Sequence, residues 1–297
     1  MTSAPPLFGL LAKPGHELSR PLSIKVLEWL AARALPVAVE RLTAEMLNLR
    51  PTERLRIIER DELTEIATPI VILGGDGTLI SASRHPAARP PVIIGVNLGT
   101  LGFLTEITSD ELLGILDLYL SGAAATVSRK LLKAEILRDG AVEASFFALN
   151  DVVLTKEAIA RIFGVNLWVN RDHAALVRGD GVIVSTPVGS TAYSLSAGGS
   201  IVHPAVDALL VTPICPHSLT SRPLVLPGSS RIRLEVAHDA RHPDNRVFLT
   251  VDGQEGQELN PGDEVVITTS EHSVQFVRSP SRNYFQVLGT KLKWATM

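Results

Sequence analysis

The pattern of apolar and polar positions divides the chain into two halves. In the first 120 or so residues, short continuous apolar runs alternate with stretches of helical spacing. Strands are predicted at 7–12, 36–40, 69–73 and 91–96. Helices are predicted at 22–35, at 54–63, from 78 onward, and after 108–111, where Thr108 and Glu111 have the spacing of a capping box. This alternation favours an open, mainly parallel sheet covered by helices.

From about residue 125 the pattern becomes β-rich. Strand-like segments follow one another closely, at 130–137, 144–154, 164–170, 174–185, 231–237, 246–254, 263–269 and 273–278. Asp139-Gly140 separates the first two segments and predicts a hairpin turn. The halves meet near residue 125 without a recognisable linker, so the fold class expected is an α/β half followed by an all-β half.

Composition narrows the range of partners. The chain has 297 residues, 45% hydrophobic and 20% charged, which allows one large or two ordinary folded domains. The net charge of −3, without runs of basic residues, argues against nucleic acid. The single cysteine, Cys215, excludes an intrachain disulfide and fits a reducing compartment. Neither a signal peptide nor an apolar run long enough to span a membrane is found, so a cytoplasmic protein is expected.

The strongest chemical signal is Gly74-Gly75-Asp76-Gly77-Thr78, directly after the apolar run 69–73. Consecutive glycines permit positive φ angles and a close approach of the backbone to a ligand. Amides at such a turn, and at the start of a following helix, attract phosphate. A carboxylate beside a phosphate site is suited to activating a hydroxyl group for phosphoryl transfer.

The alternative interpretation of this stretch is an ordinary Asp-Gly turn. The two additional glycines favour a ligand, because they cost conformational entropy without helping a simple turn. Other nucleotide and hydrolase motifs are missing. The chain has no Gly-Lys dipeptide, which a Walker A loop requires, and neither GxGxxG nor GxSxG occurs.

Three further stretches have the composition of a binding site. Residues 95–104 are glycine-rich at the end of a predicted strand, and 178–200 carries many small and hydroxyl side chains. Asn150 and Asp151 interrupt an apolar run, so their polar groups require partners if they are buried. A ligand would supply such partners, but local backbone groups and helix caps would serve as well.

Together these motifs resemble the NAD kinase family in its bacterial form. The resemblance rests on "GGDGT", "NLGTLGFL", "LNDVV", "GDGVIVSTPVGSTAYSLSAGGSIVHPAV" and "TPICPHSLTSRPLVLP", and it runs from residue 10 to residue 294. It implies transfer of the γ-phosphoryl group of ATP, with Mg²⁺ or another divalent cation, to the 2′-hydroxyl of the adenosine ribose of NAD, giving NADP. No protein ligand for the metal is assigned.

The resemblance also implies roles for individual residues. Asp76 matches the base that acts on the ribose hydroxyl. Gly74, Gly75, Gly77 and Thr78 match the phosphate loop, and Arg84 matches a nearby phosphate-facing position. The residues matched to NAD binding are Asp76, Gly77, Phe103, Asn150, Asp151, Arg161, Arg178, Asp180, Thr191, Ala192, Tyr193, Ser194, Leu195, Ser196 and Gln254.

The chain departs from the family at one of these positions, because Asp151 stands where Glu is commoner. Its shorter side chain favours a contact through water. Arg178 accompanies, in this family, a preference for NAD over NADH. The family has an α/β domain, here expected at 1–124 with 276–297 packing back onto it, and a β-rich domain, here expected at 125–275.

Family members form homodimers or homotetramers, and 164–173 is the contact segment expected here. Two rival functions share the glycine loop, a lipid kinase and a non-catalytic nucleotide sensor. A lipid kinase should carry a basic or amphipathic membrane-facing stretch, and none is found. The sequence leaves open polyphosphate in place of ATP, acceptance of NADH, and regulation by nucleotides.

Overall fold

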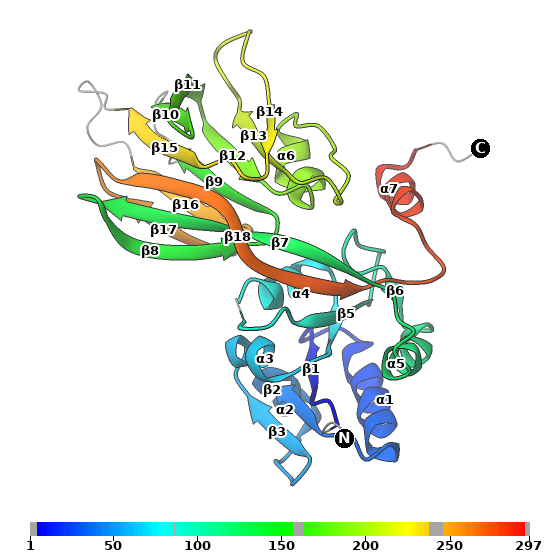
Figure 1. Cartoon of the computed structure of the whole chain (residues 1–297). Coiled ribbons are helices and arrows are strands. Elements are labelled where there is room, and N and C mark those ends of the chain that lie inside the picture. Colours follow the sequence, from blue (N-terminus) through cyan, green and yellow to red (C-terminus); the bar gives the residue numbers. More distant parts are fainter. Residues whose placement is uncertain (1–4, 86, 157–162, 238–245, 295–297) are drawn as a thin grey trace. The chain divides into compact units, whose positions relative to one another are not determined.

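The computed structural model describes residues 5–85, 87–156, 163–237 and 246–294. The chain folds into two units, which are described separately (Figure 1). Unit 1 comprises Met1–Arg129 and His272–Met297, and unit 2 comprises Lys130–Glu271. The chain leaves unit 1 within β7 (Thr126–Arg138) and returns within β18 (Glu264–Val277). The C-terminal segment therefore belongs to the α/β unit, as predicted.

Unit 1 is a parallel sheet with helices on both faces. Its strand order is β3-β2-β1-β4-β5-β18, and β6 pairs with β5. The strands are β1 (Phe8–Ala12), β2 (Val37–Glu40), β3 (Leu55–Ile58), β4 (Ile70–Gly74), β5 (Val92–Asn97) and β6 (Ile107–Thr108). The helices are α1 (Ser19–Ala32), α2 (Arg41–Leu47), α3 (Arg60–Ile66), α4 (Asp76–Ser83), α5 (Leu112–Leu120) and α7 (Tyr284–Leu292).

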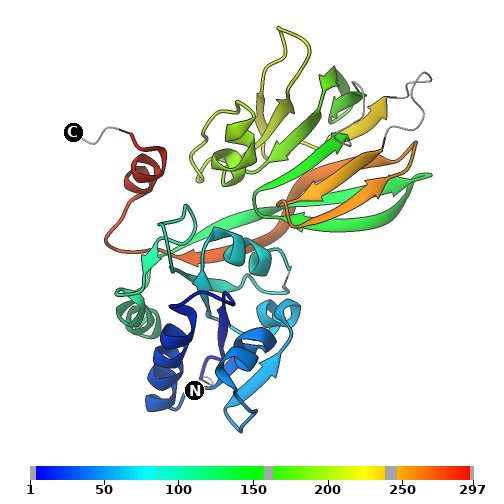
Figure 2. The same cartoon turned by 180° about the vertical axis from the view of Figure 1, so that it is seen from behind.

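Successive side chains along the strands of unit 1 point to opposite faces of the sheet, where they meet different helices. Phe8 and Leu10 of β1 pack in one cluster with residues of α1 and α5. On the other face, a Cβ at Gly9 would lie 3.1 Å from Leu63 of α3. A Cβ at Gly95 would lie 2.5 Å from Leu79 of α4, so α4 packs directly on the strand backbone. Figure 2 shows the helices from behind.

Unit 2 consists of two antiparallel sheets. One has the order β11-β10-β15-β18, with β7 paired to β18 and β8 paired to β7, and the other has the order β14-β13-β12-β9-β16-β17. The further strands are β8 (Ala141–Ala148), β9 (Asp151–Lys156), β10 (Phe163–Val169), β11 (Asp172–Gly179), β12 (Gly181–Ser185), β13 (Ala208–Ile214), β14 (Leu224–Pro227), β15 (Ile232–Ala237), β16 (Val247–Val251) and β17 (Glu255–Leu259). Apolar residues from both sheets form one buried cluster, among them Leu132, Leu167, Val182 and Val247.

Two predicted helix features are wrong. Residues 55–58 of the predicted helix 54–63 form β3, which lies at the edge of the sheet and is only partly buried, so its apolar pattern is weak. Thr108 does not cap a helix. The carboxylate of Glu111 accepts hydrogen bonds from Thr108 N and Oγ1, but α5 begins only at Leu112 and Thr108 ends β6.

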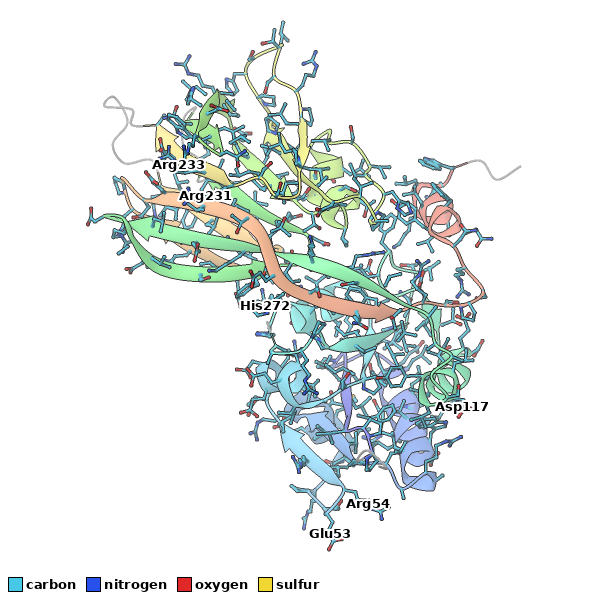
Figure 3. The ribbon with its side chains drawn as sticks, viewed as in Figure 1. Glu53, Arg54, Asp117, Arg231, Arg233 and His272 are labelled. Atoms are coloured by element: carbon cyan, nitrogen blue, oxygen red, sulfur yellow. The ribbon has the colours of Figure 1, made fainter. Side chains whose placement is uncertain are left out.

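Charged side chains lie mainly at the surface (Figure 3). Glu53 and Arg54, before β3, are exposed and point away from the sheet. No helix in the described part of the chain is both long and apolar enough to cross a membrane.

Candidate active site

The glycine loop lies where β4 ends and α4 begins. A Cβ at Gly74 would lie only 2.7 Å from Cβ of Thr78, so the fold itself requires glycine there. At Gly75 and Gly77 a Cβ would meet no atom within 4 Å, so the fold does not require glycine at either position. None of the three has a positive φ angle. The positive φ angles that glycine permits are therefore not used here, and the absence of side chains is what distinguishes these positions.

Asp76, the first residue of α4, is held by the loop that follows β5. Its Oδ1 accepts hydrogen bonds from Leu104 N (3.1 Å), Thr105 N (3.0 Å) and Thr105 Oγ1 (2.9 Å). Its Oδ2 accepts one from Phe103 N at 2.8 Å. A Cβ at Gly102 would lie 2.0 Å from Oδ1, so this glycine makes room for the carboxylate. The structure thus joins two glycine-rich stretches that the sequence presents separately.

Two polar residues that the sequence did not single out support this loop. Asn97, the last residue of β5, donates from Nδ2 to Thr105 Oγ1 at 2.9 Å and to Thr100 O at 3.0 Å. Its Oδ1 accepts from Gly99 N at 2.8 Å. Asn97 and Thr105 are both buried. The only signal in the sequence was their position beside glycines after a strand.

The other predicted residues of unit 1 lie at different distances from Asp76. Phe103 is half-buried, and Lys291 Nζ of α7 lies 5.9 Å from its ring centroid. Arg84 follows the C-terminal end of α4, a helix of eight residues, which places its backbone about 12 Å along the helix axis from Asp76. The fold alone does not bring Arg84 to the glycine loop, so its phosphate-facing role stays a prediction.

In unit 2, Asn150 and Asp151 are held by a second carboxylate, that of Asp252. Asp252 Oδ1 accepts from Asn150 N (2.8 Å) and Asp151 N (3.0 Å), and its Oδ2 accepts from Leu149 N (2.9 Å). Asp151 is 4% exposed. Burial, together with the negative charge of Asp252, raises the pKa of Asp151 from 3.8 to about 7. No sequence motif pointed to Asp252, which lies about a hundred residues further along the chain.

The segment with many hydroxyl groups packs against Asn150. Thr186 N donates to Asn150 O at 2.9 Å, and a Cβ at Gly189 would lie 2.2 Å from the same oxygen. Thr191 ends a 3₁₀ turn (Gly189–Thr191), Ala192 follows it, and Tyr193, Ser194, Leu195 and Ser196 form the short helix α6. Ser194 is buried with its Oγ 2.9 Å from Thr212 Oγ1, whereas Tyr193 is 44% exposed. The predicted NAD-binding residues 191–196 thus include side chains packed inside the protein as well as exposed ones.

The remaining predicted residues of unit 2 lie at turns and strand ends. Arg178, at the end of β11, is exposed and lines a hollow of about 330 Å³. Asp180 forms an ion pair with Lys156 at 3.1 Å. Gln254 is exposed in the turn after Asp252. Arg161 lies outside the described residues.

No group of three or more His, Cys, Asp or Glu residues that could hold a metal occurs within residues 5–85, 87–156, 163–237 and 246–294. The carboxylates of Asp76 and Asp252 instead accept hydrogen bonds from backbone amides. A divalent cation carried on the phosphates of a nucleotide fits this donor set, since Mg²⁺ usually keeps waters and binds substrate phosphates.

Family models match both halves of the chain. The ATP-NAD kinase N-terminal domain matches residues 8–124, and the ATP-NAD kinase C-terminal domain matches residues 149–279. The NAD kinase of Geobacter sp. (strain M21) is 46% identical over 290 residues, which cover 97% of this chain and 98% of that protein. The NAD kinase of Solibacter usitatus is 42% identical over 286 residues, 96% of each chain.

Solved structures agree. Yeast NADH kinase in complex with NADH has a TM-score of 0.89 at 27% identity, covering 98% of this chain and 89% of that one. An NAD kinase from Archaeoglobus fulgidus in complex with ATP has the same fold, with a TM-score of 0.73 at 22% identity, covering 97% of this chain and 99% of that one. With two matching domain models and curated relatives along nearly its whole length, the chain belongs to the NAD kinase family.

Proposed function

We propose that this chain transfers the γ-phosphoryl group of ATP to the 2′-hydroxyl of the adenosine ribose of NAD, and that Asp76 accepts the hydroxyl proton. The observation that carries the proposal is the arrangement of donors around Asp76. Three amides and one hydroxyl fix the carboxylate at the start of α4, within the glycine loop. A base fixed in this way loses little entropy when the substrate binds.

Counting hydrogen bonds identifies the oxygen that is available. An ionised carboxylate has about two acceptor sites on each oxygen. Oδ1 of Asp76 accepts three hydrogen bonds and is saturated, whereas Oδ2 accepts one, from Phe103 N. Oδ2 therefore has the capacity to accept the ribose hydroxyl. Little charge develops on the attacking oxygen early in a loose phosphoryl-transfer transition state, so a weak but well-placed base is sufficient.

The glycine loop is the proposed site of the ATP phosphates. The open space at Gly75 and Gly77 supports this assignment, because glycine there serves a ligand rather than the fold. Gly74 and Thr78 shape the loop, and Arg84 is proposed to reach toward the phosphates from the far end of α4. Mg²⁺, when bound with ATP, neutralises charge on the transferred phosphoryl group.

The residues proposed to bind NAD in unit 2 centre on Asn150. Asn150 and Asp151 are assigned to the adenosine half, with the segment from Thr191 to Ser196. Arg178 and Asp180 are assigned to the nicotinamide half, and Arg161 and Gln254 to further contacts. Phe103, in unit 1, is also assigned to NAD binding. Since Asp151 is 4% exposed and one methylene shorter than Glu, its contact is proposed to run through water.

We further propose a homodimer or homotetramer in the cytoplasm, with contacts through 164–173. These residues lie in β10 and at the start of β11, and β11 is an edge strand, which can pair with another chain. Light scattering coupled to size-exclusion chromatography would measure the assembly. A monomer at micromolar concentration would refute this part of the proposal.

The activity is tested with purified protein, Mg-ATP and NAD, following NADP through an NADP-specific dehydrogenase. Asp76→Asn should retain NAD binding and lose at least about 10²-fold in kcat, the lower range for a lost general base. Near-normal turnover of this variant would remove Asp76 from the mechanism. Sphingosine or diacylglycerol in place of NAD tests the lipid-kinase alternative, and the absence of any product from NAD would favour a nucleotide sensor.

A further inference from the structure

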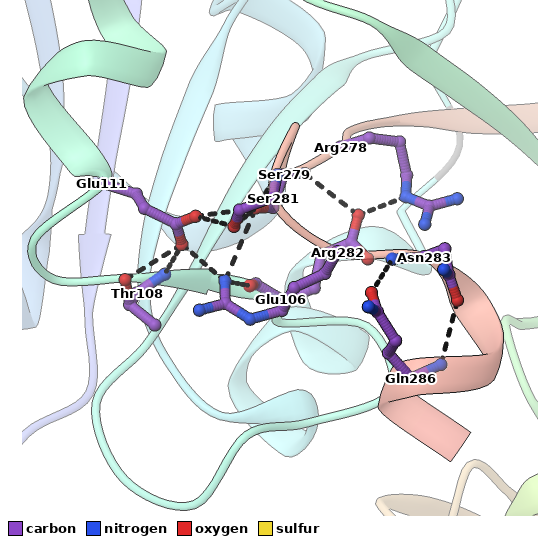
Figure 4. A network of polar contacts seen from close by, with 9 residues as sticks. All are labelled: Glu106, Thr108, Glu111, Arg278, Ser279, Ser281, Arg282, Asn283 and Gln286. Atoms are coloured by element: carbon purple, nitrogen blue, oxygen red, sulfur yellow. Dashed lines mark hydrogen bonds and ion pairs between the residues drawn. The ribbon is translucent and has the colours of Figure 1, made fainter. Parts of the chain in front are cut away.

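The C-terminal segment of unit 1 contacts Glu106, which directly follows the tripeptide 103–105 that holds Asp76 (Figure 4). Glu106 Oε1 accepts hydrogen bonds from Arg278 Nε and, at 3.2 Å, from Ser279 N. The main-chain oxygen of Glu106 accepts from Arg282 Nη1 at 2.9 Å. Arg278 follows the last residue of β18, the strand through which the chain returns from unit 2. Three residues of one short segment therefore fix both the side chain and the backbone of Glu106.

Glu106 needs this counter-charge. It is 6% exposed, and a carboxylate this buried is costly unless it is paired and hydrogen-bonded. A second guanidinium, that of Arg129, also interacts with Glu106, and burial and the positive charge of Arg278 lower the pKa of Arg129. The two arginines thus share one carboxylate, and the direct ion pair is made by Arg278.

Only one peptide unit separates Glu106 from Thr105, a residue that holds Asp76, so the position of Glu106 determines where the donor groups of Thr105 lie. Glu106 directly follows Thr105, which donates from both N and Oγ1 to Asp76 Oδ1. At the other end of the tripeptide 103–105, the ring of Phe103 lies 5.9 Å from Lys291 Nζ of α7. The amides that hold Asp76 therefore lie between two contacts with the C-terminal segment.

The segment itself is anchored firmly at Glu111. The carboxylate of Glu111 accepts hydrogen bonds from Arg282 Nη1 (2.6 Å), Ser279 Oγ (2.8 Å) and Ser281 Oγ. Burial alone would raise the pKa of Glu111, but hydrogen bonds from Ser281, Thr108 and Arg282 outweigh it and lower the pKa to about 2. A capping box between Asn283 and Gln286 then starts α7. Such an anchored segment can act as a fixed support.

We propose that Arg278 is a positioning residue for phosphoryl transfer, which through Glu106 fixes the tripeptide 103–105 and thereby the carboxylate of Asp76. The inference rests on the proposed role of Asp76 as base. Arg278 touches neither substrate in this account. It sets the direction in which Asp76 Oδ2 faces the ribose hydroxyl, where a misplacement of about 1 Å costs on the order of 10²-fold in rate.

The first test separates positioning from folding. Arg278→Met should lower kcat by about 10-fold or more while changing KM for NAD and for ATP by less than about 3-fold. Because this variant removes the direct ion pair of the buried Glu106, the double variant Arg278→Met/Glu106→Gln is measured as well. It should regain part of the melting temperature that Arg278→Met loses, because Arg129 still lacks the charge of Glu106, but it should not regain the wild-type kcat. Arg278→Lys, which keeps the charge, should recover part of the rate.

A matched control is Arg33→Met, which removes another arginine ion pair of unit 1. Arg33 lies 2.8 Å from Asp117 of α5, and both side chains are more exposed than Glu106 (Figure 3 labels Asp117). This variant should keep the wild-type kcat. A wild-type kcat in the folded Arg278→Met/Glu106→Gln variant would overturn the proposal.

A second readout does not depend on activity. Amide hydrogen exchange of peptides covering residues 100–106 should speed up in Arg278→Met and stay unchanged in Arg33→Met. Unchanged exchange in Arg278→Met would overturn the proposal even if kcat falls. The positioning role of Arg278 and the role of Asp76 as base are also overturned by different results. If Asp76→Asn loses turnover and Arg278→Met does not, only the positioning role falls; if Asp76→Asn keeps turnover, both fall.

Discussion

Two carboxylates, Asp76 in unit 1 and Asp252 in unit 2, are each bound by three consecutive backbone amides from a distant part of the chain. The surroundings differ. Asp76 has open space at the neighbouring Gly75 and Gly77, whereas Asp252 lies beside a buried second carboxylate, Asp151, whose pKa it raises. The same three-amide arrangement thus orients a proposed base in one unit and fixes a strand start in the other. Hydrogen bonding alone does not identify a catalytic group, and neither does open space, since a Cβ at Gly253, next to Asp252, would also meet no atom within 4 Å. What differs is the second, buried carboxylate beside Asp252.

The largest effect expected concerns Asp151. Its pKa is about 7 in the folded protein and about 3.8 when unfolded, so the folded state binds more protons between these values and stability falls as pH rises through this window. At about 1.4 kcal/mol per pKa unit, the penalty is at most about 4 kcal/mol above pH 7. Asp151→Asn should therefore unfold at higher urea concentration than wild type at pH 8 and at nearly the same concentration at pH 4. An equal difference at both pH values would contradict the proposed repulsion.

Gly102→Ala tests the space beside Asp76. The added Cβ would fall 2.0 Å from Oδ1, so the carboxylate or the loop must move, and kcat should fall by about 10²-fold. The control is Gly114→Ala in α5, where a Cβ meets nothing within 4 Å and alanine favours the helix. Steady-state kinetics of both variants decide the question, and a normal kcat for Gly102→Ala would show that the contact is dispensable.

Gly189→Ala should act on stability instead. Its Cβ would lie 2.2 Å from the main-chain oxygen of Asn150, a backbone atom that cannot swing away. Overpacking of this kind costs about 1–3 kcal/mol. Thermal unfolding followed by circular dichroism should show a lower melting temperature, and an unchanged value would mean that the segment 186–196 packs less tightly than described.

The smallest effect is expected for Gly77→Ala, and it sharpens the contrast with Gly189. No atom of the protein opposes the new methyl group, so the melting temperature should not fall. If the phosphates of ATP approach this backbone, kcat/KM for ATP should nevertheless fall by about 10-fold, while KM for NAD changes less. Unaltered kinetics with ATP would argue against phosphate binding at Gly77.

The sequence predicted the α/β half well, because buried parallel strands such as 69–73 are continuous apolar runs between helices. It failed at β3, a partly buried edge strand, and it did not separate β11 from β12, which the turn at Asp180 divides. It also missed β13, which has no alternation because all seven residues are buried. Alternation reports burial on one face, so it is weak in the partly buried β3 and missing in the fully buried β4 and β13. The unbroken apolar run identified β4, whereas Thr212 and Pro213 interrupt the run in β13.

For the candidate site, the sequence singled out Asp76 and Asn150 but not the groups that hold them. Phe103, Leu104 and Thr105 reach Asp76 across 27–29 residues, and Asp252 reaches Leu149–Asp151 across about a hundred. Such contacts depend on sheet order, since β4 and β5 must be neighbours before their following loops can meet. The role of Arg278 depends further on the return of β18 to β5.

The most direct test of the central claim is a crystal structure of the wild-type protein with NAD. The account predicts that the adenosine 2′-oxygen either lies within about 3.2 Å of Asp76 Oδ2 or is joined to it by one bridging water, with the tripeptide 103–105 still bound to the carboxylate. A bound dinucleotide whose adenosine ribose lies remote from Asp76, with neither a direct contact nor a bridging water, would contradict it.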